Sequence, residues 1–251
     1  MTKLTLTLDI ATYWLHARGE GGGADFDLVM DTDNEGLPLL RGRQVTGLLR
    51  LALTRAEAWG WFDTEKAEKS GKGEIAALAK AIKGNKGDAT YLITELLVGA
   101  RSDGRWKGLE SIPGCLAIGS AVVPERIRKA LVDPATDKID AATKAALFRR
   151  VESTAIDELR GVAKEKHLRS VEAAIPLPLA FDVAFAPEDL RAYMHHQPDE
   201  LAALNVIAEK WRSWLEIAWP LLDEVGAKRT RGFGRLRFSK FPNDKAGEAR
   251  S

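Results

Sequence analysis

The sequence contains few of the residues that build disulfides, metal centres and membrane spans. Of its 251 residues one is a cysteine, Cys115, and four are histidines without metal-ligand spacing. A single cysteine excludes an internal disulfide and a cysteine-cluster metal site. No run approaches the roughly 18 apolar residues of a transmembrane helix, and the alternating start MTKLTLTLDI does not resemble a signal peptide. We therefore expect a cytoplasmic protein with no membrane partner.

A strong net charge is also missing. The chain has 37 Lys and Arg against 36 Asp and Glu, which excludes a globally basic nucleic-acid binder but not a local basic surface. The charge is segregated, with five acids and no base over residues 25–35, and five bases and no acid over residues 226–237. There is no GxxxxGK[ST] phosphate loop and no G-x-S-x-G nucleophile turn. The function must therefore be sought in these local patches.

Hydrophobic periodicity predicts a mixture of strands and helices. Alternation over residues 3–10 predicts a strand, and the helical spacing from Val45 to Trp59 predicts a helix starting at Gln44. Residues 90–98 fit a helix or a strand equally well. The other expectations are a loop over 17–42, strands over 115–123, 177–185 and 235–238, helix-compatible sequence over 125–150, irregular structure over 152–176, and a helix over 198–224 that Gly226 ends.

The core elements run strand, helix, strand, strand, helix, strand. This is the order of an α+β protein with a ferredoxin-like (RRM-like) βαββαβ core, here with long insertions. We expect one domain over residues 1–241, with a flexible tail at 242–251. The insertions fall at about 17–42, 62–113 and 124–176. Because many functions share this fold, the motifs have to decide the function.

The first motif is the glycine-bearing basic segment GAKRTRGFGRLRF, residues 226–238. A dinucleotide-binding interpretation fails because that fingerprint needs a strand before it and a helix after it. Glycines that bring main-chain N–H groups to phosphate oxygens, together with cations and an aromatic ring that stacks on a base, indicate RNA binding. A solvated connection to an edge strand is the alternative. The candidate RNA-binding residues here are Lys228, Arg229, Arg231, Gly232, Phe233, Gly234 and Arg235.

Two further basic segments are candidates for the same role. LPLLRGRQVTGLLRLAL, residues 37–53, places Arg41, Arg43 and Arg50 around a helix start, where free N–H groups attract anions. An ordinary helix start is the alternative. The segment before the third expected strand carries Lys164, Lys166, His167 and Arg169, which suit a nucleic acid, a neighbouring subunit or a charged surface.

The acidic segment ADFDLVMDTDNE, residues 24–35, is the candidate for chemistry. Clustered carboxylates can hold Mg²⁺, and one of them can act as a general base on a ribose 2′-hydroxyl. A solvated acidic loop is the alternative. No calcium-loop pattern fits this segment.

Two of these motifs together resemble the RAMP superfamily of CRISPR-associated proteins. Its members have a proline- and glycine-bearing helix start similar to residues 36–50, and a glycine-rich loop between the last helix and the last strand similar to residues 226–238. The stretch TAIDELRGVAKEKHLRSVE also resembles a segment of type III backbone and backbone-like subunits. The chain departs from the usual Pro-Gly-Ser-Ser followed by Lys, since it has Arg41-Gly42-Arg43-Gln44 and Thr46.

The resemblance implies a guide-RNA-binding subunit of a type III-like CRISPR ribonucleoprotein effector in antiviral defence. Its partners would be guide RNA, complementary target RNA and other CRISPR-associated subunits. In target-cleaving backbone subunits an aspartate after the first strand cuts RNA, and Asp27, with Asp25 next, matches that place. Such a metal-dependent endoribonuclease would use Mg²⁺ as its cofactor. The alternatives are a non-catalytic capping or assembly subunit, a protein-binding module, and a metabolic enzyme of ferredoxin-like fold.

Overall fold

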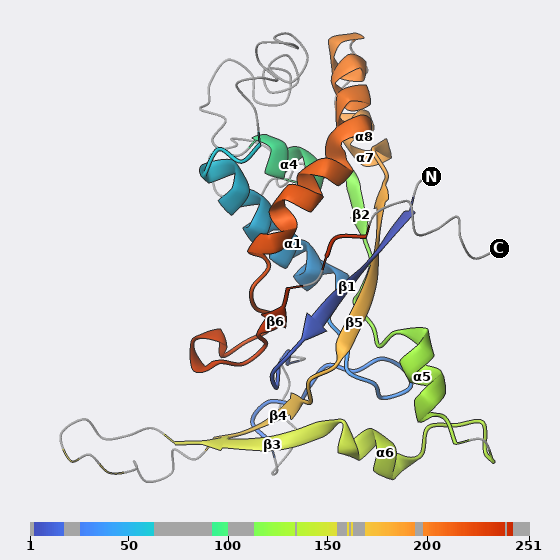
Figure 1. Ribbon diagram of the computed structural model, residues 1–251, viewed down its shortest axis with the longest axis vertical. Helices are drawn as coiled ribbons and strands as arrows, with labels where there is room; N and C mark the ends of the chain where they lie inside the picture. Colours follow the sequence, from blue (N-terminus) through green and yellow to red (C-terminus); the bar gives the residue numbers. More distant parts are fainter. Residues whose placement is uncertain are drawn as a thin grey trace.

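The structure is a computed structural model that describes residues 3–17, 26–62, 92–99, 113–133, 135–154, 160, 162, 169–193, 198–238 and 240–242. Figure 1 labels its elements, of which the 3₁₀ turns η1 and η2 are left unlabelled. In chain order they are β1 (Lys3–Ile10), α1 (Gly42–Ala58), α4 (Leu92–Val98), β2 (Leu116–Ile118), α5 (Glu125–Leu131), α6 (Ala141–Ala146), β3 (Phe148–Ser153), β4 (Arg169–Ala174), β5 (Pro178–Phe185), α7 (Glu188–Tyr193), α8 (Pro198–Ala218), η1 (Trp219–Leu221), η2 (Arg229–Arg231) and β6 (Leu236–Arg237).

The main sheet has four antiparallel strands in the order β2-β5-β1-β6. β1 and β5 are its central strands, with Leu4 opposite Val183 and Leu6 opposite Phe181. Successive side chains of a strand point to opposite faces, so the alternation seen in the sequence buries one face of β1 and exposes the other. The expected strands at 3–10 and 177–185 are confirmed within a residue, and the α+β class is confirmed.

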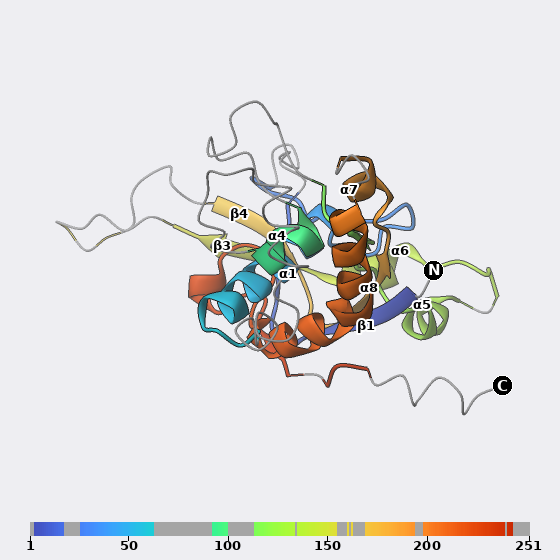
Figure 2. The same cartoon turned by 90° about the horizontal axis from the view of Figure 1, so that it is seen from above.

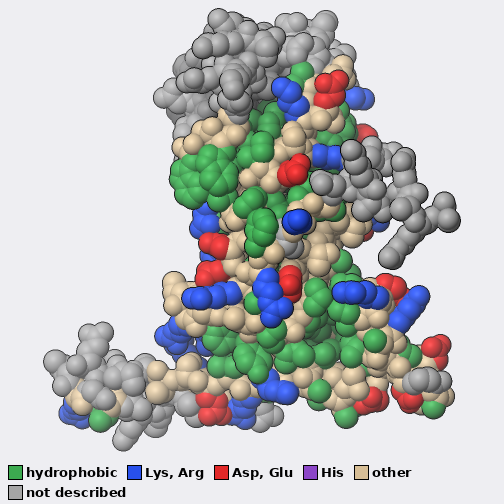
Figure 3. Space-filling model, in the orientation of Figure 1, with side chains coloured by type: hydrophobic (Ala, Val, Ile, Leu, Met, Phe, Trp, Pro, Cys, Tyr) green, Lys and Arg blue, Asp and Glu red, His purple; other side chains and the backbone are tan. Residues whose placement is uncertain are grey.

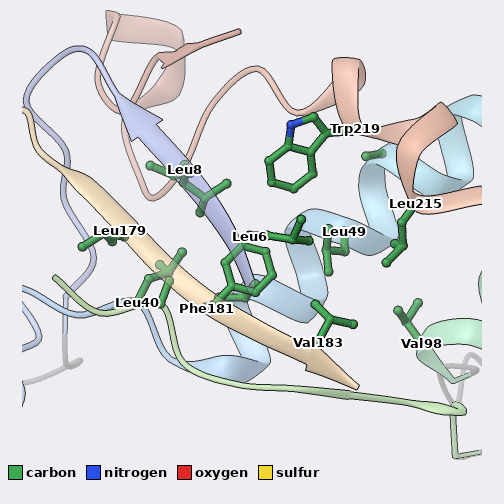
Figure 4. Packing of buried hydrophobic residues seen from close by; sticks show 14 of the residues in the cluster. Leu6, Leu8, Leu40, Leu49, Val98, Leu179, Phe181, Val183, Leu215 and Trp219 are labelled. Carbon is green, nitrogen blue, oxygen red and sulfur yellow. The ribbon is translucent and has the colours of Figure 1, made fainter. Parts of the chain in front are cut away.

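The helices α1 and α8 cover the buried face of this sheet, and they pack against each other (Figures 1 and 2). Figure 4 shows Leu6, Phe181 and Val183 from the strands meeting Leu49 of α1 and Leu215 of α8. Such a core is the main source of stability, because burial removes apolar surface from water. Among the described residues no helix is long and apolar enough to cross a membrane.

The first helix forms where its apolar spacing predicts. α1 buries Val45, Leu49, Ala52, Leu53 and Ala56 on the face toward the core. Trp59, which the spacing assigned to that face, instead follows the last helical residue and is exposed. The difference arises because the chain leaves the helical path at this point.

Within the stretch 90–98, whose sequence fitted either element, the described residues Leu92–Val98 form the short helix α4, and α1 holds it at both ends. Glu57 accepts backbone hydrogen bonds from Ile93 (2.9 Å) and Thr94 (3.0 Å) in the first turn of α4. Arg50 donates to the carbonyls of Val98 (2.5 Å) and Gly99 at the other end. A carboxylate at the N-terminus and a guanidinium at the C-terminus both match the polarity of the helix. α4 therefore lies antiparallel to α1.

The predictions for residues 125–176 are partly wrong. α5 and α6 lie in the stretch called helix-compatible, but its end and the stretch called irregular contain β3 and β4, which pair antiparallel as a second sheet. β3 carries Arg149, Arg150 and Glu152 at exposed positions and has no clean alternation of buried side chains. A strand without such alternation leaves no period-2 signal to find. The paired strands β3 and β4, called the β3–β4 arm below, and helix α5 extend to opposite sides of the body (Figures 1 and 2).

Two other predicted elements are shorter than expected. The strand over 115–123 is limited to β2, after which Ala121 and Val122 make isolated bridges to Leu40 and Ala180. The helix over 198–224 ends at Ala218 and continues as η1, where Pro220 lacks the N–H that an α-helix would use. Gly226 therefore does not end a helix.

Candidate nucleic-acid interface

A surface groove of about 870 Å³ brings together two basic segments that lie far apart in the sequence. α1 lines one side with residues from Arg43 to Thr54. The other side is the glycine-rich loop, residues 226–235, which contributes Gly226, Ala227 and Arg229. His16, from the segment after β1, also lines the groove. Two motifs that were predicted separately thus form one surface.

The glycine-rich loop is fixed by hydrogen bonds to the segment that follows β1. Ala227 and Gly234 donate backbone hydrogen bonds, each 2.8 Å long, to the carbonyls of Leu15 and Tyr13. The two ends of the loop also meet, because Val225 donates to the carbonyl of Gly234 at 2.8 Å. These backbone hydrogen bonds therefore fix the conformation of the loop within the fold.

Its three glycines have different roles. Gly226 (φ +75°) and Gly234 (φ +70°) lie so close to neighbouring backbone that a Cβ would overlap the carbonyls of Leu15 and Val225. Gly232 (φ +80°) has open space where its Cβ would be. Positive φ favours glycine at all three positions. Close packing therefore requires Gly226 and Gly234, whereas the main chain at Gly232 is open to a ligand.

The outer side of the loop carries the cations. Lys228 has a left-handed backbone (φ +57°) and starts η2, which holds Arg229 and Arg231 at exposed positions. Phe233 is half-buried beside them. Non-glycine residues held in this conformation are uncommon and often lie at functional sites.

Ion pairing separates the predicted RNA-binding arginines into two groups. Arg41 pairs with the buried carboxylate of Asp31 through Nε (2.5 Å) and Nη2 (2.9 Å), and Arg50 is held by α4. By contrast, no ion pair within the described ranges neutralises the cations of the groove rim and its surroundings, which are Arg43, Arg169, Lys228, Arg229, Arg231 and Arg235. Unneutralised cations that lie together attract an anion.

The start of β4 belongs to the same positive region. Burial lowers the pKa of Lys228, and the nearby charges of Arg231 and Arg169 lower it further. Arg169 at the start of β4 is therefore close enough to the glycine-rich loop to act on Lys228. On the lower half of the face drawn in Figure 3, Lys and Arg side chains lie among Asp and Glu side chains.

His16 is a groove residue that the sequence analysis missed. Burial lowers its pKa, the charge of Asp31 opposes this effect, and Arg43 and Arg41 lower the pKa further. The side chain is thus biased toward its neutral form between one buried acid and two guanidinium groups. No signal in the sequence pointed to it, because its partners come from a different segment.

The acidic segment lies along β4, on the side where Arg169 begins that strand. Asp27 and Ser170 exchange two hydrogen bonds, from Asp27 N to the Ser170 carbonyl (2.8 Å) and from Ser170 N to Asp27 Oδ2 (2.7 Å). Met30 N donates to Glu172 Oε2 at 3.0 Å. Asp27 is exposed, and its Oδ1 has no hydrogen-bond partner among the described residues.

The fit of this segment to Mg²⁺ is limited to one carboxylate. In the part of the chain that the structure describes, no group of three or more His, Cys, Asp or Glu side chains is placed to hold a metal. Mg²⁺ commonly binds through one or two carboxylates together with substrate phosphates. Asp27 suits that mode and does not build a metal site from protein groups alone.

The profile of the RAMP superfamily matches residues 7–237 of this sequence. The chain belongs to the RAMP superfamily. None of the curated proteins matches it. Two solved structures are among its matches. One is described as type III-B Cmr-beta bound to cognate target RNA (8% identity, TM-score 0.49, covering 94% of this chain and 97% of that chain), and the other as the apo state of type III-B Cmr-beta (11%, 0.48, 95% and 97%).

In this RAMP protein the structure brings together some of the predicted site residues. Arg43, Arg50 and Arg229 line one groove, and Arg169 lies near the loop. Asp27 is joined to the strand that Arg169 begins. The candidates Asp25, Lys164, Lys166 and His167 lie outside the described residues.

Proposed function

We propose that this RAMP protein is a guide-RNA-binding subunit of a type III-like CRISPR ribonucleoprotein effector. The RNA backbone would lie in the groove between α1 and the glycine-rich loop, and the β3–β4 arm would reach toward the guide–target duplex or a neighbouring subunit. The family resemblance supports membership of such a complex. The cations that line the groove support the proposal that the protein binds RNA.

The observation that carries the proposal is the convergence of cations from separate segments, for which the described residues provide no ion pair. Arg43 comes from the start of α1, Arg229 and Arg231 from the glycine-rich loop, and Arg169 from β4. Phosphates would supply the missing negative charge, and the open space beside Gly232 would allow close approach. Backbone contacts of this kind are blind to base sequence, as a subunit that accepts many guides requires.

The test is RNA affinity over a salt series with the double variant Arg43→Ala/Arg229→Ala. Each lost phosphate contact lowers the slope of log affinity against log salt by about 0.7 for a single strand. We expect weaker binding and a slope smaller by about 1.4. Arg55→Ala is the matched control, because Arg55 pairs with Asp223 (3.2 Å) and is not a groove residue. Unchanged affinity and slope in the double variant would contradict the proposal.

A second candidate function, nested in the first, is cleavage of target RNA. Asp27 would take the proton of a ribose 2′-hydroxyl, whose oxygen then attacks the adjacent phosphorus while the 5′-oxygen leaves. The two hydrogen bonds with Ser170 fix its position at the start of β4, the strand that Arg169 begins, and Arg169 would stabilise the charge on the phosphate. Mg²⁺, when bound, would supply further stabilisation of that charge.

The cleavage proposal is tested with the assembled complex and complementary RNA. We expect Asp27→Asn to abolish cutting while RNA affinity stays at the parental level, and Asp25→Ala to show whether the neighbouring acid contributes. Parental cutting by both Asp27→Asn and Asp25→Ala would exclude a catalytic role for this segment and leave a non-catalytic capping subunit.

The finer fold assignment belongs to the same proposal. The sheet order β2-β5-β1-β6 with α1 and α8 on one face supports a ferredoxin-like core within a single domain over residues 1–241. A protein-binding assembly module is the rival from a different class. The ratio of absorbance at 260 and 280 nm of the purified protein separates the two, since an RNA binder carries nucleic acid with it.

A further inference from the structure

Two tryptophans at the end of α1 are exposed. Trp59 and Trp61 keep 59% and 43% of their surface in water, whereas the other described tryptophans, at positions 14, 211, 214 and 219, are buried. Tryptophan has a large apolar surface, and leaving it in water forgoes the stabilisation that burial would give. The exposure of the two rings therefore makes them candidates for contact with a ligand.

The backbone beneath the two rings is fixed. Trp61 donates to the carbonyl of Ala56 (2.9 Å) and Gly60, at φ +68°, donates to the carbonyl of Glu57 (3.0 Å). These two bonds and the left-handed glycine make a Schellman motif at the end of the helix. Phe62 follows and is buried in the core. The rings, with centroids 5.5 Å apart and planes tilted by 57°, thus stand on a rigid turn.

The pair lies beyond the end of the groove along α1. The helical part of the groove runs from Arg43 to Thr54, and Trp59 lies about 8 Å further along the axis at 1.5 Å per residue. Figure 3 shows hydrophobic side chains exposed over this end of α1.

The surroundings of the pair favour bases over a protein surface. Among the described residues next to the pair, Ala58 is small and Gly60 has open space where a Cβ would be, so these two add little apolar surface to the rings. A stable protein interface needs roughly 800 Å² from each partner, whereas a nucleobase needs only the face of a ring. Proteins that hold single strands combine a cationic groove with such rings.

We propose that Trp59 and Trp61 form a stacking platform for unpaired bases of the RNA strand whose backbone lies in the groove. The tilt between the rings prevents both from stacking on one flat face, so each ring takes its own base. This inference rests on the proposed function, because the groove supplies the strand.

The test is the binding of a labelled single-stranded oligouridylate to the full chain. We expect Trp59→Ala/Trp61→Ala to lower affinity about tenfold or more, with an unchanged salt slope because stacking releases no counterions. Trp59→Phe/Trp61→Phe should bind nearly as the parent does, and Trp59→Leu/Trp61→Leu should bind as weakly as the alanine variant. Oligouridylate should also quench the tryptophan fluorescence of the parent, and much less that of the leucine variant.

The possible failures are distinguishable. Parental affinity of the alanine variant overturns the platform while the loss in Arg43→Ala/Arg229→Ala still supports RNA binding. Rescue by leucine as full as that by phenylalanine overturns stacking in favour of simple apolar contact. Loss of a co-purifying subunit at unchanged RNA affinity overturns the platform in favour of a protein contact. No binding by the parent removes the proposed function and the platform together. Unchanged thermal unfolding of the variants excludes misfolding as the cause of any loss.

Discussion

The α1–α4 contact and the glycine-rich loop use the same kind of residue in opposite ways. In the first, Arg50 donates hydrogen bonds to two backbone carbonyls and Glu57 accepts them from two backbone N–H groups. Both charged side chains therefore hold α4 in place. In the second, Arg229 and Arg231 lie on a loop fixed by hydrogen bonds, and no acid among the described residues forms an ion pair with them. Whether an arginine stabilises the fold or is available to a ligand therefore depends on the protein groups that lie within its reach.

The glycines of the loop also differ in role, since Gly234 is closely packed and Gly232 is not. Substituting them should give the largest change in stability predicted for this protein. Gly234→Ala places a Cβ against the carbonyl of Val225 and keeps φ at +70°, so we expect about 3 kcal/mol or more of destabilisation. Gly232→Ala, the matched control, meets no atom within 4 Å and should cost about 1 kcal/mol from the left-handed backbone alone. Urea unfolding measures both. Equal losses would show that the two sides of the loop do not differ.

The second prediction compares two arginines of α1. Arg50→Ala removes hydrogen bonds to the carbonyls of Val98 and Gly99 and should destabilise the protein by about 2 kcal/mol. Arg43→Ala should change stability by less than about 0.5 kcal/mol, because Arg43 has no ion pair in the part of the chain described.

RNA affinity should show the reverse order for these two variants. Arg43→Ala should weaken binding, and Arg50→Ala should affect it mainly through the fold. Denaturant melts and salt-dependent RNA titrations of the same two proteins give this comparison. A stability loss in Arg43→Ala as large as in Arg50→Ala would break the distinction.

The sequence predicted the parts of the molecule that depend on local patterns. Alternation found β1, helical spacing found α1, and the two basic segments were both recognised. It failed where the outcome depends on distant partners. The charged strand β3 was missed because its pairing with β4 leaves no alternation. Arg41 and Arg43 look alike in the sequence, and only the buried carboxylate of Asp31 separates them.

The smallest expected effect concerns His16, which lies between the two kinds of arginine. Burial lowers its pKa from the ordinary value of 6.5. A depressed pKa in the folded state means that its contribution to stability is complete above pH 6.5 and is lost as the pH falls through the folded pKa. The His16→Gln variant does not titrate, so it should lose less stability than the parent between pH 7 and pH 5, with little difference at pH 7.

Urea unfolding of the parent and the His16→Gln variant at both pH values measures this difference, and Asp31 and Arg41 contribute equally in the two proteins. RNA affinity of the parent should rise below pH 6.5, since a protonated His16 adds a cation to the groove beside Arg43. An identical pH dependence of stability in the two proteins would show that the groove does not act on His16, and it would weaken the picture of one continuous cationic surface from α1 to the glycine-rich loop.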